Sequence, residues 1–195
     1  MTTDASGLRV SEVPVDEMFL NRWSPRSFAP KRVPAETIAT LFEAARWTMS
    51  CFNEQPWLFL YATSDEDLAL YRSLLTEGNR WADSAPFLGF VLARRHFNKT
   101  GKQNRQAPFD AGAAWMAFTM EARRHGLYTH GMAGFHLELA HEKLGVKTDD
   151  YDIMAAFALG WLAERSTLSP EAAERDSKRS QRKPLAHVAM AGLNR

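Results

Sequence analysis

The sequence predicts an α+β domain whose sheet is covered on both faces by helices. Three runs of apolar residues, at 57–62, 86–93 and 153–161, have the length of strands and carry almost no polar side chain. Strands of this kind are buried on both faces. Segments with a helical spacing of apolar residues alternate with them, and 195 residues are enough for one domain with its own core.

Two helices are expected before the first strand. The shorter covers 15–22 and ends at the Ser24-Pro25 step, because the residue before a proline disfavours the helical conformation. The longer covers 34–47. Pro34 suits its first turn, and its apolar residues recur on one face, so this helix should pack on the sheet.

Three further helices are expected along the rest of the chain. Thr63-Ser64-Asp65-Glu66 resembles a capping box and opens a helix that runs to Leu75. The other two cover 110–124 and 137–144, and the glycines Gly126 and Gly145 end them. The first of these carries several alanines, which would let a neighbouring helix approach closely.

Two segments do not fit a compact core. Residues 98–108 contain one alanine among polar, glycine and proline residues, which predicts a loop, with a lid as one role open to it. Ten of the twenty residues from 164 to 183 are charged. Because such a segment cannot form a core of its own, it is either disordered or lies on another surface.

Composition excludes several classes of function. With 24 basic and 23 acidic side chains, the formal charge of +1 predicts neither a nucleic-acid nor a membrane-surface partner. Cys51 is the single cysteine, so no intrachain disulfide forms and no multi-thiolate zinc site exists. No apolar stretch is long enough to span a membrane, and the N-terminus lacks the pattern of a secretory signal. The default location is the cytoplasm.

Two segments combine residues that suit a ligand. Arg22, Ser24 and Arg26 flank a proline and would form a compact cradle for a phosphate, although a solvated loop explains them equally well. The segment 49–57 places Ser, Asn and Gln side chains among Phe and Trp rings. This mixture suits a planar heteroaromatic ligand, and an ordinary polar loop is the alternative.

Glycines and charges suggest two more candidates. Gly131 and Gly134, three residues apart, let the backbone approach a ligand, although a plain turn would also contain them. They do not form a dinucleotide-binding fingerprint, and no other stretch does. The run from Arg179 to Pro184 is a charged tail of a kind that is usually solvated.

Taken in order, these segments resemble the nitroreductase family of FMN-dependent oxidoreductases. The blocks, which extend over about residues 18–188, are R-W-S-P-R-S-F, S-C-F-N-E-Q-P-W, G-N-R-W-A-D-S-A-P, G-M-A-G-F, A-L-G-W and R-K-P-L. The resemblance implies a three-layer α+β fold with a mixed, mostly antiparallel sheet. It also implies a homodimer, with a flavin-binding domain at 1–163 and an arm at 164–195 that packs on the partner and returns to the flavin.

The resemblance assigns the site residues as follows. The first block would hold the phosphate, the ribityl chain and the pyrimidine edge through Arg22, Trp23, Ser24 and Arg26, with Arg26 also tuning the flavin as a cation. The second would reach the partner's flavin through Met49, Ser50, Cys51, Asn53 and Gln55, although Met49 and Cys51 replace the family's Pro and second Ser.

The remaining blocks complete the implied site. Asn79, or Arg80 beside it, matches a polar group near the pyrimidine edge. The backbone that meets flavin N5 corresponds to Gly131, Met132, Ala133 and Gly134, and many relatives carry Glu in place of Ala133. From the tail, Arg182 with Arg179 or Ser180 would close on the phosphate.

The implied function is ping-pong hydride transfer through flavin N5, with FMN bound and NAD(P)H as co-substrate. The acceptor is a small electron-poor molecule: a nitroaromatic, a quinone or free flavin. The alternatives are a specialised flavin enzyme, such as a dehalogenase or a flavin-fragmenting enzyme, and a non-catalytic flavin-binding protein. Metal binding by His136 and His141 is unfavourable because they lie five positions apart and so do not share a helix face. No thiol-hydrolase pattern surrounds Cys51.

Overall fold

The computed structural model describes residues 9–164, 166 and 168–192. A four-stranded antiparallel sheet lies at its centre, in the order β1-β2-β4-β3. Its strands are β1 (Trp57–Ala62), β2 (Phe87–Arg94), β3 (Tyr128–Met132) and β4 (Tyr151–Gly160). The helices are α1 (Glu17–Asn21), α2 (Ala35–Arg46), α3 (Asp65–Ser73), α4 (Ala107–Arg124), α5 (Leu137–Lys143) and α6 (Pro170–Ser177). Among these, no helix is long and apolar enough to cross a membrane.

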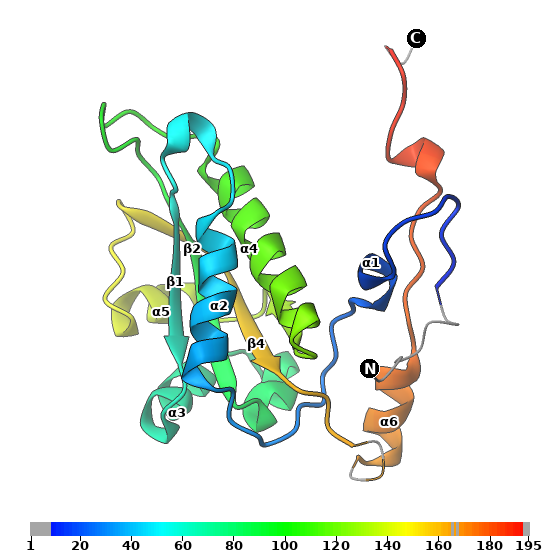
Figure 1. Ribbon diagram of the computed structural model, residues 1–195. Coiled ribbons are helices and arrows are strands. Elements are labelled where there is room, and N and C mark those ends of the chain that lie inside the picture. Colours follow the sequence, from blue (N-terminus) through cyan, green and yellow to red (C-terminus); the bar gives the residue numbers. More distant parts are fainter. Residues whose placement is uncertain (1–8, 165, 167, 193–195) are drawn as a thin grey trace.

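Helices cover both faces of the sheet, as the apolar strands predict (Figure 1). One face packs on α2 and α4 through Phe87, Val91 and Phe157 of the sheet. The small buried residues Ala111 and Ala114 of α4 lie in this layer, and the two helices pack closely. The other face carries Leu88, Phe90 and Leu92 toward α3 and α5 and toward a 3₁₀ segment, η2 (Glu77–Ser84). The predicted α+β class with a sheet between helix layers is confirmed.

Several predicted boundaries differ from the structure. Helix α4 begins at Ala107, three residues earlier than expected, with Pro108 in its first turn. Pro34 is the N-cap of α2 and does not lie in its first turn. The N-cap of α3 is Ser64, whose hydroxyl accepts the N–H of Asp67, so the capping pair lies one residue later than predicted. Each difference is a shift of a terminus, and the element itself is present.

Strand β3 and helix α6 were not predicted. Residues 128–132 pair with β4 from Tyr128 opposite Gly160 to Met132 opposite Ala156. Of the two glycines for which a plain turn was considered, Gly131 therefore lies in an edge strand, and Gly134 follows that strand. Helix α6 forms within the highly charged segment, and Ser169 caps it by accepting the N–H of Ala172 at 3.2 Å.

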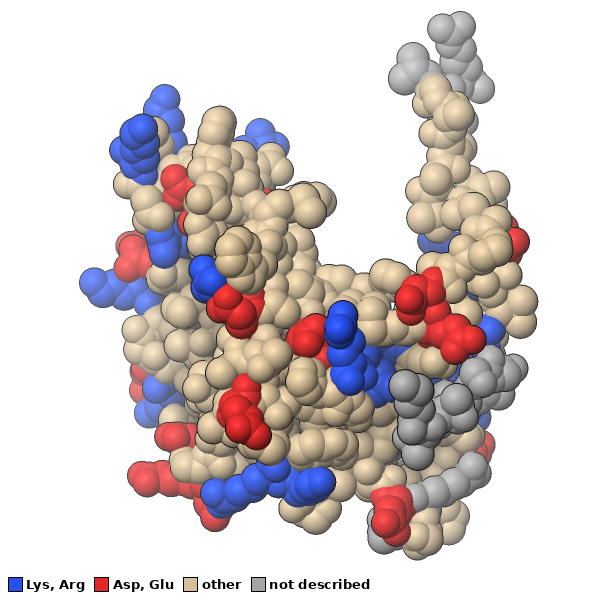
Figure 2. Space-filling view, viewed as in Figure 1, with Lys and Arg blue, Asp and Glu red and all other residues tan. Residues whose placement is uncertain are grey.

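The two ends of the chain lie side by side, apart from the layers of the sheet (Figure 1). Helix α1 and the segment before it run along the C-terminal arm, where the N–H of Leu185 donates to Glu12 at 3.0 Å. A cavity of about 400 Å³ lies between these segments. Figure 2 shows the molecule hollowed between the arm and the main body. The predicted contact of residues 164–195 with a partner chain stays a prediction.

Candidate functional site

Arginines from both ends of the chain converge beside α1. Burial, followed by the charge of Arg182, lowers the pKa of the Arg22 guanidinium. Burial also lowers the pKa of Arg9, and the charges of Arg182, Arg22 and Arg179 act in the same direction. Like charges held this close raise one another's free energy. We call Arg9, Arg22, Arg179 and Arg182 the arginine cluster.

No carboxylate neutralises three members of this cluster. Within the described residues, Arg9, Arg22 and Arg182 form no ion pair, and the Nε of Arg9 is buried without a hydrogen-bond partner. The Arg9 side chain does donate to the carbonyls of Leu20, at 3.2 Å, and Arg22, at 2.5 Å. Guanidinium groups bind phosphates in two-pronged fashion, so the cluster fits a phosphate-bearing ligand.

A stack of planar groups fixes the arm over this region. The guanidinium of Arg179 lies 3.3 Å from the ring centroid of Trp23. Trp23 meets Tyr128 edge to face at 5.9 Å, and Arg123 lies 3.6 Å from the Tyr128 ring. Trp23 is 7% exposed. Its ring is therefore part of the packing under the arm, and its predicted contact with a cofactor stays a prediction.

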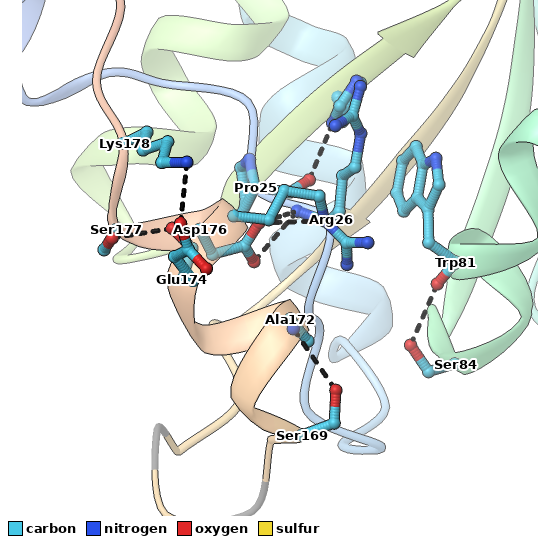
Figure 3. Close-up of polar contacts among 12 residues, drawn as sticks. Pro25, Arg26, Trp81, Ser84, Ser169, Ala172, Glu174, Asp176, Ser177 and Lys178 are labelled. Carbon is cyan, nitrogen blue, oxygen red and sulfur yellow. Dashed lines mark hydrogen bonds and ion pairs between the residues drawn. The ribbon is translucent and has the colours of Figure 1, made fainter.

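Helix α6 is tied to the turn that carries Arg26. Figure 3 shows Asp176 reaching from α6 to the Arg26 backbone, whose N–H donates to both carboxylate oxygens at 3.2 Å. The side chain of Arg26 is exposed, while the hydroxyl of Ser24 accepts a hydrogen bond from Arg22 at 3.4 Å. The structure therefore joins Arg22 to Ser24, and the predicted phosphate cradle of these two residues with Arg26 stays a prediction.

His130 joins strand β3 to the same turn. Its Nδ1 lies 2.7 Å from the carbonyl oxygen of Pro25, and since a carbonyl only accepts, Nδ1 carries the proton. The imidazole packs against Trp81, with ring centroids 4.4 Å apart and the ring planes tilted by 36°. Burial lowers the pKa of His130, and the Arg26 and Arg22 charges oppose the raising effects of the Pro25 carbonyl and Asp176. The ring thus lies next to the cations with a pKa below its ordinary value.

The end of β3 is fixed by hydrogen bonds to a single carbonyl. The Gly134 oxygen accepts from the Thr76 N–H at 3.1 Å, the Thr76 hydroxyl at 3.0 Å and the Asn79 amide at 2.7 Å. Asn79 in turn accepts from the Trp81 indole at 3.2 Å. The structure therefore brings Asn79 next to the 131–134 segment, and a contact of Asn79 with a flavin stays a prediction.

The segment 49–55 has an unusual backbone. Phe52, Asn53 and Gln55 have φ values of 52°, 57° and 48°, a left-handed region that costs about 1 kcal/mol or more for a residue with a Cβ. Buried Asp110 holds the segment by accepting the Cys51 N–H at 3.1 Å, and the Ser50 hydroxyl accepts the Gln55 N–H at 3.0 Å. Such strain is typical of a functional site.

This segment lies at the far end of the sheet from the arginine cluster. It leads into Trp57, which pairs with Ala93, and Ala93 pairs with Asp152 near the start of β4. The turn with Arg26 adjoins the other end, where the carbonyl of Ser27 accepts the N–H of Ala163. The ten residues of β4 span roughly 30 Å at about 3.3 Å per residue. One chain therefore does not bring Ser50, Cys51 and Asn53 to the arginine cluster.

Three contributors to the site were missed by sequence reasoning: Arg9, His130 and Asp110. Arg9 lies outside every motif, and the other two act on residues distant in sequence, so no local signal could have found them. Of the predicted tail residues, Arg182 and Arg179 belong to the arginine cluster, while the Ser180 carbonyl accepts from Arg182 at 3.2 Å. In the described part of the chain, no group of three or more His, Cys, Asp or Glu could hold a metal ion.

Comparison with known proteins decides the family. A model of the nitroreductase family matches residues 20–80 and 71–161. The chain belongs to the nitroreductase family. This family membership makes it an oxidoreductase.

Two relatives in sequence show the range of similarity to this nitroreductase-family chain. An uncharacterized 15.4 kDa protein of Mycolicibacterium smegmatis is 37% identical over 129 residues, which are 66% of this chain and 85% of that protein. A protein of Stenotrophomonas maltophilia strain K279a, named "Putative NADH dehydrogenase/NAD(P)H nitroreductase", is 27% identical over 134 residues, 68% of this chain and 67% of that one.

Solved nitroreductase-family structures share the fold. A crystal structure of an oxidoreductase containing FMN is 43% identical, with a TM-score of 0.88, and the match covers 95% of each chain. A nitroreductase family protein from Clostridium difficile 630 is 18% identical with a TM-score of 0.71, covering 93% of this chain and 100% of that one. The second likeness supports the fold alone.

Replacing Gly134 by alanine should destabilise the end of β3. A Cβ there would lie 2.6 Å from the Thr76 hydroxyl and 2.7 Å from the Asn79 amide nitrogen, so both would have to move. We expect a loss of about 1–3 kcal/mol in the free energy of unfolding, measured in urea. The control is Gly112→Ala in α4, where nothing lies within 4 Å and alanine should stabilise the helix. A Gly134→Ala protein as stable as wild type would contradict this account of the carbonyl.

Replacing Asp176 by alanine should release α6 from the Arg26 turn. Loss of hydrogen bonds to a charged acceptor should lower the free energy of unfolding by about 1–3 kcal/mol and speed tryptic cleavage near α6. Glu174→Ala removes a solvent-exposed pair with Lys178 in the same helix and should change stability by less than about 0.5 kcal/mol. Equal effects of the two substitutions would refute the special role of Asp176.

Proposed function

We propose that this protein is an FMN-dependent oxidoreductase that takes hydride from NAD(P)H and reduces a small electron-poor acceptor. Nitroaromatics, quinones and free flavin are acceptors of this kind. The observation that carries the proposal is the arginine cluster beside Trp23, in which, within the described residues, no carboxylate pairs with Arg9, Arg22 or Arg182. The 43% identity to an oxidoreductase containing FMN supports the same cofactor.

The residues of the chain have distinct roles in this proposal. Arg9, Arg22 and Arg182 bind the phosphate, because its negative charge would offset the repulsion between their guanidinium groups. Arg26 is the cation at the pyrimidine edge, where a positive charge favours the reduced, anionic form. When bound, FMN supplies both the acceptor and the donor of hydride.

The neutral side chains hold the surroundings of the ring in place. His130 fixes the Arg26 turn by donating to Pro25, and the Gly134 carbonyl is fixed by Thr76 and Asn79. The backbone of Ala133 and Gly134 can therefore meet a ligand without reorganising, as electrostatic catalysis requires. Because Ala133 has no carboxylate, its contribution is limited to the backbone.

We propose further that the enzyme is a homodimer in which each flavin lies between two chains. Segment 49–55 is at the far end of the sheet from its own arginine cluster, so a second copy would supply it. Large apolar side chains near this segment are exposed, and a partner would cover them: Trp47, Met49 and Phe109 are 76%, 81% and 74% exposed. In this arrangement residues 1–163 form the flavin-binding domain, and residues 164–195 form an arm that packs on the partner. The proposed location is the cytoplasm, where NAD(P)H is available.

Titration with FMN tests the proposal. The purified protein should bind FMN and acquire a yellow absorbance, which NADPH or NADH should bleach without oxygen and an added quinone should restore. Protein that stays colourless with FMN would overturn the proposal. Flavin that binds but is not reduced by either nucleotide would favour a specialised flavin enzyme or a non-catalytic flavin-binding protein.

The same titration tests the arginine cluster. Arg22→Ala should weaken FMN binding by about 1.5–3 kcal/mol, the range for a hydrogen bond to a charged group. It should hardly change the unfolding of the apoprotein, since a repelling charge is removed. Arg32→Ala, which breaks an exposed pair with Asp65, is the matched control and should leave FMN affinity unchanged. Unchanged affinity in Arg22→Ala would remove Arg22 from the phosphate site.

A further inference from the structure

A hairpin at residues 96–103 forms a pocket beside the segment 49–55. His96 bridges to Gln103, the Phe97 N–H donates to the Lys102 carbonyl at 2.8 Å, and Gly101 takes a φ of 67° in the turn. The loop predicted from its polar composition is therefore a hydrogen-bonded turn. The pocket has a volume of about 590 Å³ and is lined by Phe52, Glu54, Phe97, Lys99, Thr100, Lys102 and Gln103.

Two contacts fix the hairpin to the strained segment. The Glu54 carboxylate accepts the N–H of Asn98 at 2.9 Å. The rings of Phe52 and Phe97 meet edge to face with centroids 6.1 Å apart. Phe52 has a strained, left-handed backbone, and its ring is 88% exposed. The ring therefore offers an aromatic face at the mouth of the pocket. These two contacts hold the hairpin against segment 49–55.

The pocket combines these rings with unneutralised positive charge. Lys99 and Lys102 are exposed and, within the described residues, form no ion pair. Lys and Arg side chains gather at this end of the molecule, at the upper left of Figure 2. Among the lining residues the acid is Glu54, whose carboxylate is engaged with the backbone of Asn98. An aromatic ring that carries phosphate matches this set of partners.

We propose that this pocket binds the adenosine half of NADPH and selects its 2′-phosphate through Lys99 and Lys102. The inference rests on the proposed function, in which segment 49–55 reaches the flavin of the partner. The hairpin then stands at the rim of that flavin site, so a dinucleotide lying over the flavin extends into the pocket. The volume is within the range of small-molecule sites, and Phe52 and Phe97 offer faces to the adenine.

The test uses the FMN-loaded enzyme and the double variant Lys99→Ala/Lys102→Ala. Calorimetric titration with 2′,5′-ADP and with 5′-AMP reports binding without turnover, and steady-state assays give KM for NADPH and NADH. The double variant should raise the Kd of 2′,5′-ADP and the KM for NADPH about tenfold. The KM for NADH should rise less than about threefold, and kcat should not change. Lys147→Ala, an exposed lysine outside the pocket, is the control and should match wild type.

Each other outcome overturns the inference in a recognisable way. If NADPH reduces the double variant as well as wild type, with an unchanged KM for NADPH, the pocket is rejected and the proposed function still stands. If the double variant loses activity only with free FMN as the acceptor and not with riboflavin, the lysines bind the phosphate of the acceptor and not that of NADPH. A wild type that neither nucleotide reduces would overturn the proposed function and this inference together.

Discussion

The arrangement of the site depends on positive charges that no carboxylate pairs with in the described part of the chain. Arg9 and Arg22 come from the N-terminal segment and Arg182 from the C-terminal arm, and their mutual repulsion opposes the packing of the two ends. The Arg179–Trp23 stack and the Asp176 hydrogen bonds oppose that repulsion and keep the arm in place. An anion with several acceptor oxygens would offset this repulsion and accept hydrogen bonds from the guanidinium groups. A phosphate-bearing cofactor therefore suits this position.

The second constraint is the length of the sheet. Strand β4 places the Arg26 turn and segment 49–55 about a strand length apart, and each is held rigidly in its position. Neither can reach the other within one chain. In the proposed homodimer, two copies related by a two-fold axis would complete both sites, because each chain would contribute one end to each site. The exposed apolar side chains around segment 49–55 favour the same solution.

The sequence predicts the parts of this molecule that local patterns determine. Strand β1 was predicted with its bounds, since WLFLYA is an unbroken apolar run, and β2 and β4 within two residues. Strand β3 was missed because His130 and Gly131 interrupt its apolar character, and pairing with β4 makes it a strand. Helix α6 was missed because its charged residues show no apolar face, although Ser169 and Pro170 are local signals of a helix start. His130 acts on Pro25 across 105 residues, and Asp176 on Arg26 across 150. Contacts of that separation leave no trace in one sequence.

Mixing two defective chains tests most directly whether each flavin lies between two copies. One chain carries Arg22→Ala, and the other carries Ser50→Ala, Asn53→Gly and Gln55→Gly, where glycine keeps the left-handed backbone. Each homodimer should bind FMN weakly. The purified heterodimer contains one site with every defect and one with none, so it should bind one FMN per dimer with wild-type affinity. A heterodimer in which both sites remain weak would place Arg22 and Asn53 in the site of the same chain and contradict the account.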